Sequence, residues 1–349
     1  MSKRLYRPFF LVALPIAAAA SVQAGQITDM TGRKVTVPDK ITKVFASQPY
    51  TNVLLYVVAP DLMLGLQPGC LPFREEDKRF LRRDILSKPW ISAQSPGGER
   101  AQVNMEAILA MKPDIAIATT GGNMMMAPGR IEDRYAQLGL PLVMVNVDQI
   151  HGYADAIDFL GRLLGRQERA KQLSAWTRST LGGVAKMVAS IPQDQRVRVY
   201  YAESADGLAT ESDSSFHAAA IKMAGASIVH HGDLKTHQGT EKVSLEQVLV
   251  YDPQVIISQE PDFAAFAYKD PRWQRVKAVV DHRIYTVPRS PFDWVDRPPS
   301  VMRIVGVPWV AYMLYPRQYH ADIRKQIRDF HRLFMGIDVS ESDLNGWLK

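Results

Sequence analysis

The same order of apolar and polar positions occurs twice along the chain. The two copies are VNMEAILAMKPDIAIATT (residues 103–120) and VSLEQVLVYDPQVIISQE (residues 243–260), which align without a gap at an offset of 140 residues (243 − 103). The identical residues include Val103/Val243, Glu106/Glu246, Leu109/Leu249 and Pro113/Pro253. Self-similarity of this kind predicts an internal structural repeat.

Each copy predicts a helix that leads into a strand. Its apolar residues fall at i, i+3 and i+4, which is the spacing of one helix face; they are Met105, Ile108 and Leu109 in the first copy and Leu245, Val248 and Leu249 in the second. Asn104 and Ser244 stand before these residues as N-caps, and a turn that contains proline follows them. The next apolar runs, IAIA and VIIS, are typical of buried parallel strands.

The remaining pattern places one such unit in each half of the chain. Further strand-like runs are ITKVFA, LGLQ and LPLVMVNV in the first half and VRVYYA, SIVHH and RIYTVP in the second. Between them, residues 153–165 and 166–191 have a helical period, and a helix of about 25 residues extends roughly 37 Å, although Gly182 and Gly183 weaken the second of these helices. We predict an α/β fold with two similar α/β lobes, mostly parallel sheets, a long backbone helix that joins the lobes, and a ligand cleft between them.

The N-terminus has the features of a secretory signal peptide. Lys3, Arg4 and Arg7 precede the apolar run FFLVALPIAAAA, and VQA fits a small-x-small cleavage site. This run is too short for a membrane span, which needs about 20 apolar residues, and no cysteine for lipid attachment lies near the cleavage site. We expect a signal peptide at residues 1–24, an N-terminal lobe at 25–148, a helical connector at 149–192 and a C-terminal lobe at 193–349, free outside the cytoplasm.

Charge and composition narrow the class of function. The formal charge of +6 falls to +3 (6 − 3) without the three signal-peptide charges, and the remaining basic residues are scattered, which disfavours a nucleic-acid partner. Cys70 is the only cysteine, so no disulfide forms within the chain. An enzyme is disfavoured because Cys70 has no evident histidine partner, no phosphate-binding P-loop occurs, and TTGGN lacks the spacing of a dinucleotide-binding loop.

Several segments resemble a known family, the helical-backbone (class III) periplasmic binding proteins of ABC importers for iron-siderophore, haem and cobalamin. The segments are ITDMTGRKVTVPDKITKVF, both repeat copies, LGLPLVMVN and DPRWQRVKAVVDHRIYTVP, so that the resemblance covers essentially the whole mature chain. It implies a periplasmic, monomeric solute-binding protein without catalysis, whose partners are a metal-chelate ligand and an inner-membrane ABC permease. Glu106 and Glu246 match the glutamates that dock onto permease arginines in that family, although a carboxylate in the first turn of a helix is also favoured by the helix dipole.

The ligand-binding candidates lie in loops that follow the predicted strands, where open α/β sheets bind their ligands. Tyr50, Phe292 and Trp294 offer rings for stacking, and Arg100, Arg289 and Arg297 offer charge for an anionic group. The prolines of SPFDWVDRPPS, residues 290–300, would order this loop before binding. The alternatives are that Trp294 is a core residue, that Arg297 pairs with Asp293 or Asp296, and that Tyr50 caps the following helix.

The ligand identity is the least constrained part of the prediction. A ferric siderophore is the first candidate because aromatic and arginine side chains are both available, and molybdate or tungstate, a nickel chelate, haem and cobalamin are alternatives. His230, His231 and His237 are weak candidates for direct metal ligands, since closely spaced polar loop residues are more often solvated. The methionines of NMMM, residues 123–126, suit an apolar ligand face or the core equally well. A ligand sensor with the same fold is a further possibility.

Overall fold

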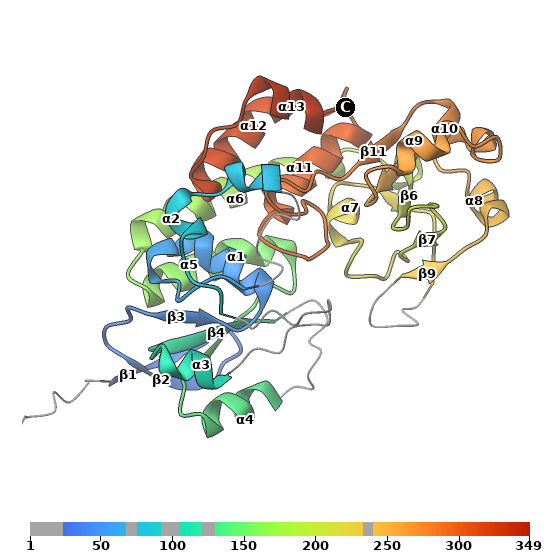
Figure 1. Ribbon diagram of the computed structural model, residues 1–349. Helices are drawn as coiled ribbons and strands as arrows, with labels where there is room; N and C mark the ends of the chain where they lie inside the picture. The colour runs from blue at the N-terminus through green and yellow to red at the C-terminus, as the bar shows by residue number, and fades with distance from the viewer. Residues whose placement is uncertain (1–23, 68–74, 92–104, 121–129, 233–239) are drawn as a thin grey trace, which may run out of the picture.

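The structure is a computed structural model that describes residues 24–67, 75–91, 105–120, 130–232 and 240–349. Two α/β lobes lie side by side, and helices from the middle and the end of the chain run along both of them (Figure 1). The predicted fold class is confirmed: both central sheets are parallel, and a long helix follows the first sheet in the chain.

The N-terminal sheet contains β3 (Val44–Ala46), β4 (Ile115–Thr119) and β5 (Leu142–Val145) in the order β3-β4-β5. Every residue of these strands is buried, because helices cover a parallel sheet on both faces. A separate antiparallel hairpin, β1 (Ala24–Thr28) with β2 (Lys34–Pro38), packs beside the sheet through the hydrogen bond from Met30 N–H to the Met144 carbonyl at 3.1 Å. The helices of this lobe are α1 (Pro49–Val58), α2 (Arg83–Leu86), α3 (Met105–Ala110) and α4 (Arg130–Gln137), with η1 (Pro60–Leu62) and η2 (Glu75–Phe80).

The C-terminal sheet has the order β11-β10-β6-β8 and is also parallel throughout. Its strands are β6 (Arg198–Ala202), β8 (Ser227–Ile228), β10 (Val255–Ser258) and β11 (Ile284–Thr286), with a small antiparallel pair of β7 (Ala209–Thr210) and β9 (Glu241–Lys242) beside it. The helices of this lobe are α7 (Ala219–Met223), α8 (Leu245–Tyr251), α9 (Phe263–Ala267), η5 (Trp273–Arg275) and α10 (Lys277–Val280).

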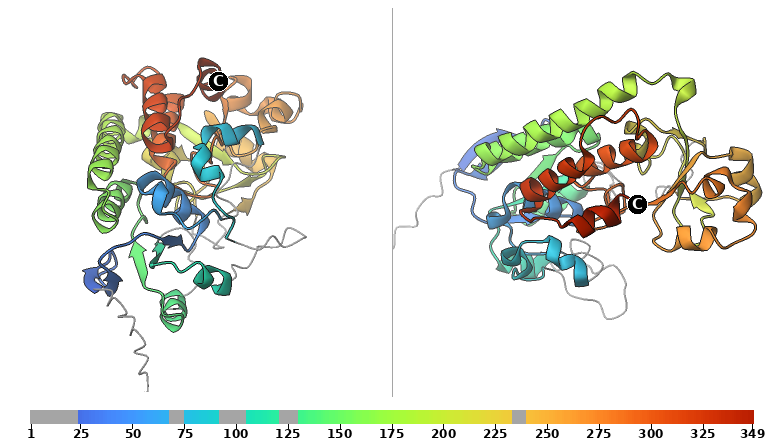
Figure 2. Two further views of the ribbon diagram at one scale, coloured as in Figure 1. Left: turned by 60° about the vertical axis from the view of Figure 1, so that its left-hand side comes forward. Right: turned by 90° about the horizontal axis from the view of Figure 1, so that it is seen from above.

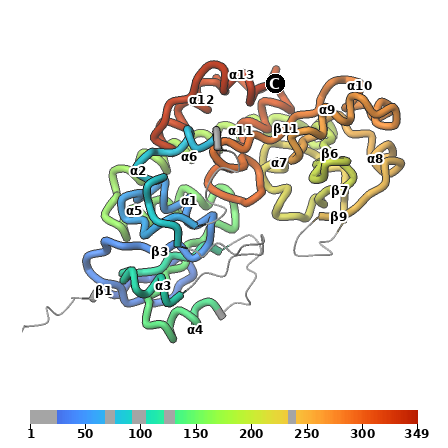
Figure 3. Tube along the Cα trace, viewed as in Figure 1, coloured from blue at the N-terminus to red at the C-terminus, as the bar shows by residue number. Residues whose placement is uncertain are grey.

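The predicted backbone helix is α6 (Gln167–Ala189), and it is continuous through Gly182 and Gly183. It follows η3 (Ile150–Gly152) and α5 (Tyr153–Leu163) and precedes η4 (Gln193–Gln195). After the second sheet the chain returns along α6 in α11 (Arg303–Leu314), α12 (Ile323–Phe330), the π-helix η6 (His331–Met335) and α13 (Glu341–Trp347), as Figure 2 shows and Figure 3 traces. Trp176 of α6 fixes this packing, because its ring contacts Phe330 at 5.7 Å and Phe334 at 5.4 Å.

One large apolar core extends through both lobes. It joins the inner faces of the two sheets to α1, α5, α6, α11 and α12, and a smaller core lies on the outer side of each sheet. The lobe boundaries expected at residues 148 and 193 therefore remain a proposal. They separate the two sheets, but the main core is continuous across them. Among the residues in the described ranges, no helix is both long and apolar enough to cross a membrane.

Candidate functional site

Polar side chains gather where the strands of the C-terminal sheet end. Glu203 follows β6, Gln259 follows β10, and residues 290–297 lie beyond β11. The N-terminal lobe brings α1 to the same region, since Phe292 shares a small void with Asn52 and Tyr56 of that helix. The segment 290–297, which follows the C-terminal sheet, therefore also lies against α1 of the N-terminal lobe, and ligand sites in open α/β sheets lie beyond the carboxyl ends of strands.

Arg297, whose side chain is 36% exposed, is the centre of an ion-pair network with two buried carboxylates. Its Nη2 lies 2.6 Å from Oε2 of Glu203 and 2.8 Å from Oε1 of Glu211, and its Nε donates to Oε1 of Glu203 at 3.0 Å. A further hydrogen bond goes to the Thr240 hydroxyl at 2.9 Å. Two carboxylates this deeply buried need a paired cation, so Arg297 fixes the loop that carries it.

The network changes the acidity of its members. Burial, and then the charge of Glu203, raise the pKa of Glu211 to about 8, while a hydrogen bond from Ser215 and the charge of Arg297 oppose this shift. Burial disfavours the charge of Arg297, but the hydrogen bond to Glu203 and the nearby Asp296 outweigh it and hold the pKa of Arg297 above its usual range. Glu211 therefore carries a proton near neutral pH, whereas Arg297 keeps its charge.

A second charged group holds the end of the same loop. Asp296 accepts from Nη2 of Arg303 at 2.6 Å and lies 2.5 Å from Nδ1 of His217. Arg303 also donates from Nε to the Val295 carbonyl at 2.9 Å, and its guanidinium lies over the Phe216 ring. These contacts are buried and mutually satisfied, which indicates a structural role.

Asp293 organises the turn between these groups. Its Oδ1 accepts the backbone N–H groups of Val295 and Asp296 at 2.8 Å each, and burial raises the pKa of Asp293 to about 6. Arg289 lies 3.7 Å from its Oδ2 and donates a hydrogen bond to the Gln259 carbonyl. Within the described ranges, Oδ2 of Asp293 and Oε1 of Gln259 are buried and accept no hydrogen bond.

The structure corrects the predicted stacking role of Trp294 and Phe292. Trp294 is 0% exposed, donates its indole N–H to the Ser290 carbonyl at 3.1 Å, and contacts the rings of His331 and Trp347. Phe292 is 5% exposed and belongs to the main core. Trp294 packs against the C-terminal helices and Phe292 lies beside α1 of the N-terminal lobe, so both rings are core residues in this structure.

The predicted arginines are also engaged. Arg297 was predicted to bind ligand, with pairing to Asp293 or Asp296 as the alternative; its close partners in the structure are Glu203 and Glu211, and Asp296 lies farther away at 3.8 Å. Local sequence gave no signal for these partners, because they lie 94 and 86 positions away. Arg100 lies outside the described residues, as do His237 and the methionines of residues 123–126.

Tyr50 is the predicted ring that keeps partial exposure. It lies in the first turn of α1, directly after β3, and burial raises its pKa. Its neighbour Tyr153 has a pKa raised to about 12, mainly by burial, and the charges of Arg303 and Asp296 also act on this hydroxyl. Tyr153 thus lies within electrostatic reach of both lobes, a position that the sequence patterns did not single out.

Glu106 and Glu246 lie on the surface, each in the first turn of its repeat helix. The predicted N-cap of the second helix is confirmed, since the Ser244 hydroxyl accepts the Gln247 N–H at 3.2 Å; Asn104 lies outside the described residues. Hydrogen bonds from its own backbone N–H and from Ser244, with the charges of Arg272 and Arg275, hold the pKa of Glu246 below its usual value.

The histidines that were weak metal candidates have other partners. His230 contacts the Tyr251 hydroxyl through Nδ1 at 2.7 Å and lies 3.4 Å from Glu241, and His231 pairs with Asp213 at 2.8 Å. In the part of the chain that the structure describes, no three His, Cys, Asp or Glu side chains come together as a metal site.

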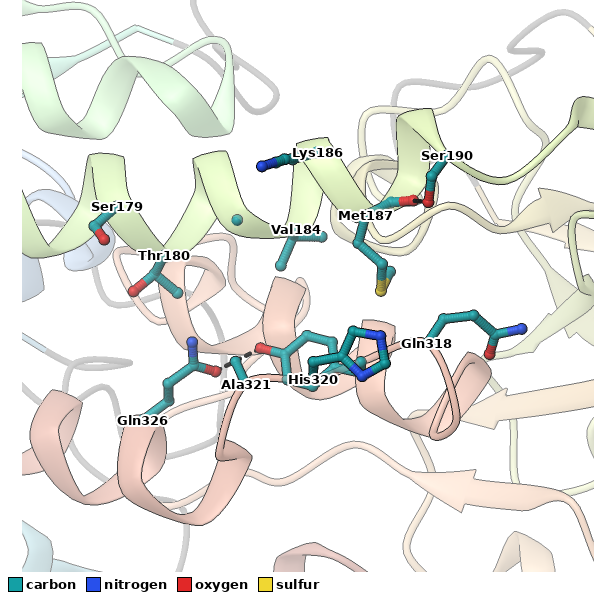
Figure 4. Close-up of a pocket in the computed structure, with 12 residues that line it drawn as sticks. Ser179, Thr180, Val184, Lys186, Met187, Ser190, Gln318, His320, Ala321 and Gln326 are labelled. Atoms are coloured by element: carbon teal, nitrogen blue, oxygen red, sulfur yellow. Dashed lines mark hydrogen bonds between the residues drawn. The ribbon is translucent and has the colours of Figure 1, made fainter.

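A groove of about 560 Å³ lies elsewhere, between α6 and residues 318–326. Figure 4 shows Val184 and Met187 of α6 on one side of the groove, and Gln318 and Gln326 on the other. Its lining residues belong to α6 and to residues 318–326, and not to the loops that follow the strands. They include no cluster of charged side chains, so this groove is not the primary candidate for the solute site.

Comparison with known proteins agrees with this architecture. The molybdate-binding protein MolA of Haemophilus influenzae is 24% identical over 88% of this chain and 90% of its own length. The vitamin B12-binding protein of Yersinia pestis is 28% identical over 47% of this chain and 57% of its own length. The structure of an ABC transporter solute binding protein from Sulfurospirillum deleyianum superposes with a TM-score of 0.82 and 33% identity, covering 92% of this chain and 98% of that one.

These relatives are binding proteins and not enzymes. The family model described as periplasmic binding protein matches residues 77–291, which include both repeat copies and the beginning of the loop that carries Trp294 and Arg297. With that match and the two-lobe fold, this chain belongs to the periplasmic binding protein family.

Proposed function

We propose that this protein is the solute receptor of an ABC importer and delivers a metal-containing solute to the inner-membrane permease. The observation that carries the proposal is the match of nearly the whole chain, at 33% identity, to a solute-binding protein of an ABC transporter with the same two-lobe fold. The position of residues 290–297, beyond β11 and against α1 of the N-terminal lobe, supports a solute site between the lobes.

The receptor acts as a monomer in the periplasm. The signal-peptide pattern of residues 1–24 supports export, and the absence of a cysteine near its end supports a mature form without a lipid anchor. Glu106 and Glu246 are the proposed contacts with the permease, since exposed carboxylates on both lobes complement basic side chains on a partner.

A compact metal oxyanion such as molybdate or tungstate is the first candidate solute. It is favoured by the molybdate-binding relative, which aligns with 88% of this chain. The ferric siderophore expected from the sequence becomes the second candidate, because Trp294 and Phe292 are buried and Arg297 is already paired. The ferric siderophore remains a candidate because Tyr50 is partly exposed and offers one ring for contact with a chelate.

Calorimetric titration of the mature protein tests both candidates. Molybdate and tungstate are compared with sulfate, ferric catecholate, hydroxamate and citrate chelates, nickel–histidine, haem and cobalamin. We expect saturable binding of molybdate or tungstate, weakened about 10- to 100-fold in Arg100→Ala by the loss of a charged hydrogen bond. Arg317→Ala, at an exposed position, is the matched control.

The outcomes separate the hypotheses. Binding of one ferric chelate alone, weakened in Tyr50→Ala, would support the second candidate and reject the first. If none of these metal species binds to the folded protein, the proposal that its solute contains a metal is wrong.

A further inference from the structure

The groove between α6 and residues 318–326, here called the α6 groove, is large enough for a small molecule. Its volume of about 560 Å³ lies within the range of small-molecule sites, which is roughly 300–1,000 Å³. It shares no lining residue with the loops that follow the strands. A molecule bound here would therefore leave the solute site between the lobes unoccupied.

A glycine opens the groove on the side of α6. Gly183 lines it, and a side-chain carbon at this position would meet no atom within 4 Å. Ser179 and Lys186, four positions before and three after, lie on the same helix face and also line the groove. The adjacent Gly182 is equally uncrowded, but it does not line the groove. A bound molecule can thus approach the backbone of α6 at Gly183.

The interior of the groove is partly apolar. Val184 is buried, and Met187 is half-buried. Figure 4 shows both side chains extending from α6 toward residues 318–326. An apolar floor of this kind suits the uncharged body of an organic molecule, because contact with it removes apolar surface from water.

Polar groups without a partner lie at one end of this floor. Thr180 lines the groove and is 6% exposed, and its hydroxyl makes no hydrogen bond to any residue in the described ranges. Most buried hydroxyls have a partner, so this one is available to a ligand. Gln326 accepts the Tyr319 hydroxyl with its Oε1, and its amide N–H groups donate to no described residue. Figure 4 shows Thr180 and Gln326 extending toward each other from opposite sides of the groove.

The charges of the groove favour an anion. Lys186 and His320 line it, and among the described residues neither has an ion-pair partner. The lining residues in the described ranges include no aspartate or glutamate. Lys186 is exposed at the rim, where its flexible side chain can reach a bound group. Donors and a lysine without a neighbouring carboxylate are the groups that recognise an acid.

We propose that the α6 groove is a second small-molecule site and that it binds an organic acid with an apolar body. The apolar body lies over Gly183 and along Val184 and Met187. The carboxylate accepts hydrogen bonds from Thr180 and Gln326. This site is independent of the solute proposed above, since it uses none of the residues assigned to that solute.

Calorimetric titration of the mature protein tests this site. The probe is 4-phenylbutyrate, and its uncharged counterpart is 4-phenylbutanol. We expect saturable binding of one molecule of the acid, weaker binding of the alcohol, and a loss of about tenfold or more in Gly183→Leu, whose side chain fills the groove. Gly182→Leu is the matched control and keeps the wild-type affinity. Both variants are expected to fold, because leucine favours a helix more than glycine does.

Two further variants examine the acid group and the location. Thr180→Val keeps the shape of the side chain and removes the hydroxyl, so we expect binding of the acid to weaken about 3- to 10-fold. Its thermal stability should not fall, because a buried hydroxyl without a partner is unfavourable in the folded protein. Tyr50→Ala, at the proposed solute site, should leave binding of the acid unchanged.

The opposite results would overturn the inference. If 4-phenylbutyrate does not bind to the folded wild-type protein, the α6 groove is not a site for such acids. Equal losses in Gly183→Leu and Gly182→Leu, or a loss in Tyr50→Ala, would place the acid elsewhere. If 4-phenylbutanol binds as tightly as the acid, the groove does not recognise a carboxylate.

Discussion

The chemistry of single residues in this site is controlled by burial. The side chains of Glu203 and Glu211 are almost completely buried, and both pair with Arg297 from a different part of the chain. The sequence analysis assigned Arg297 to ligand binding, and its alternative was a pair with the neighbouring Asp293 or Asp296. Local patterns predict contacts within an element, whereas the partners of a buried charge are chosen by the assembled fold, so this pairing was not predictable from the sequence.

The raised pKa of Glu211 makes a prediction about stability and pH. Between its ordinary value of 4.5 and about 8, the unfolded chain releases this proton while the folded protein retains it. The folded state then binds more protons, so its stability falls as pH rises through this window. In Glu211→Gln, which cannot titrate, we expect the decrease between about pH 6 and about pH 8 to be smaller by an amount on the order of 2 kcal/mol.

Urea unfolding at several pH values measures this difference. The range above about pH 6 is chosen because Asp293, with a pKa of about 6, contributes a decrease of the same sign below it. Glu341→Gln is the control, since Glu341 is exposed and its lowered pKa affects stability only at acidic pH. Parallel pH profiles for wild type and Glu211→Gln would show that Glu211 does not hold the proton.

At the scale of elements, periodicity was the successful guide. Both repeat copies form a helix and a strand, α3 with β4 and α8 with β10, because their apolar spacing matches the buried faces. LGLQ, residues 64–67, was expected to be a strand but forms only an isolated bridge from Leu66 to Trp90, and a second bridge joins the preceding Met63 to Val44. A short apolar run does not specify how many of its backbone groups find a partner.

The glycines of the helical connector differ in the space available for a side chain. A side-chain carbon at Gly183, in the middle of α6, would meet no atom within 4 Å, whereas one at Gly161 of α5 would overlap Ala170 of α6. We expect Gly183→Ala to stabilise the protein by about 0.5–1 kcal/mol, since alanine loses less backbone entropy in a helix. Gly161→Ala is expected to destabilise it, because the close contact between α5 and α6 must open.

Chemical denaturation of both variants measures these effects. Equal destabilisation by the two substitutions would mean that the backbone of α6 needs a glycine at position 183 for a reason other than space. A gain in stability without loss of solute binding would show that this glycine is not required for binding.

At the scale of the whole molecule, the repeat predicted two lobes but not what holds them together. The C-terminal helices return across the N-terminal lobe, where Arg79 of η2 pairs with Asp343 of α13 at 2.5 Å. Residues 290–300, here called the cleft loop, begin with Ser290, which also donates to Asp77 of the N-terminal lobe at 2.5 Å. These contacts join residues more than 200 positions apart, and no periodicity in the sequence reports such a distance.

Trp347 is the residue through which this connection is best tested. Its ring stacks on His331 at 5.0 Å, contacts Trp294 at 5.1 Å and contacts Phe80 of the N-terminal lobe at 5.3 Å. It therefore supports the cleft loop and the lobe contact at once. We expect Trp347→Ala to lower the free energy of unfolding by about 2–3 kcal/mol, below the range for a fully buried tryptophan because this side chain is partly exposed.

Hydrogen exchange separates a local effect of Trp347→Ala from a general one. If Trp347 holds the cleft loop, the amides of Val295 and Asp296 lose protection before those of β10, because the loop can open while the sheet stays folded. Trp90→Ala is the control, at a tryptophan that is 48% exposed, and it changes stability by only about 0.5 kcal/mol. Uniform loss of protection across the loop and β10 would mean that the C-terminal helix stabilises the whole fold and not the site, and the cleft loop would then owe its order to Arg297 and Arg303 alone.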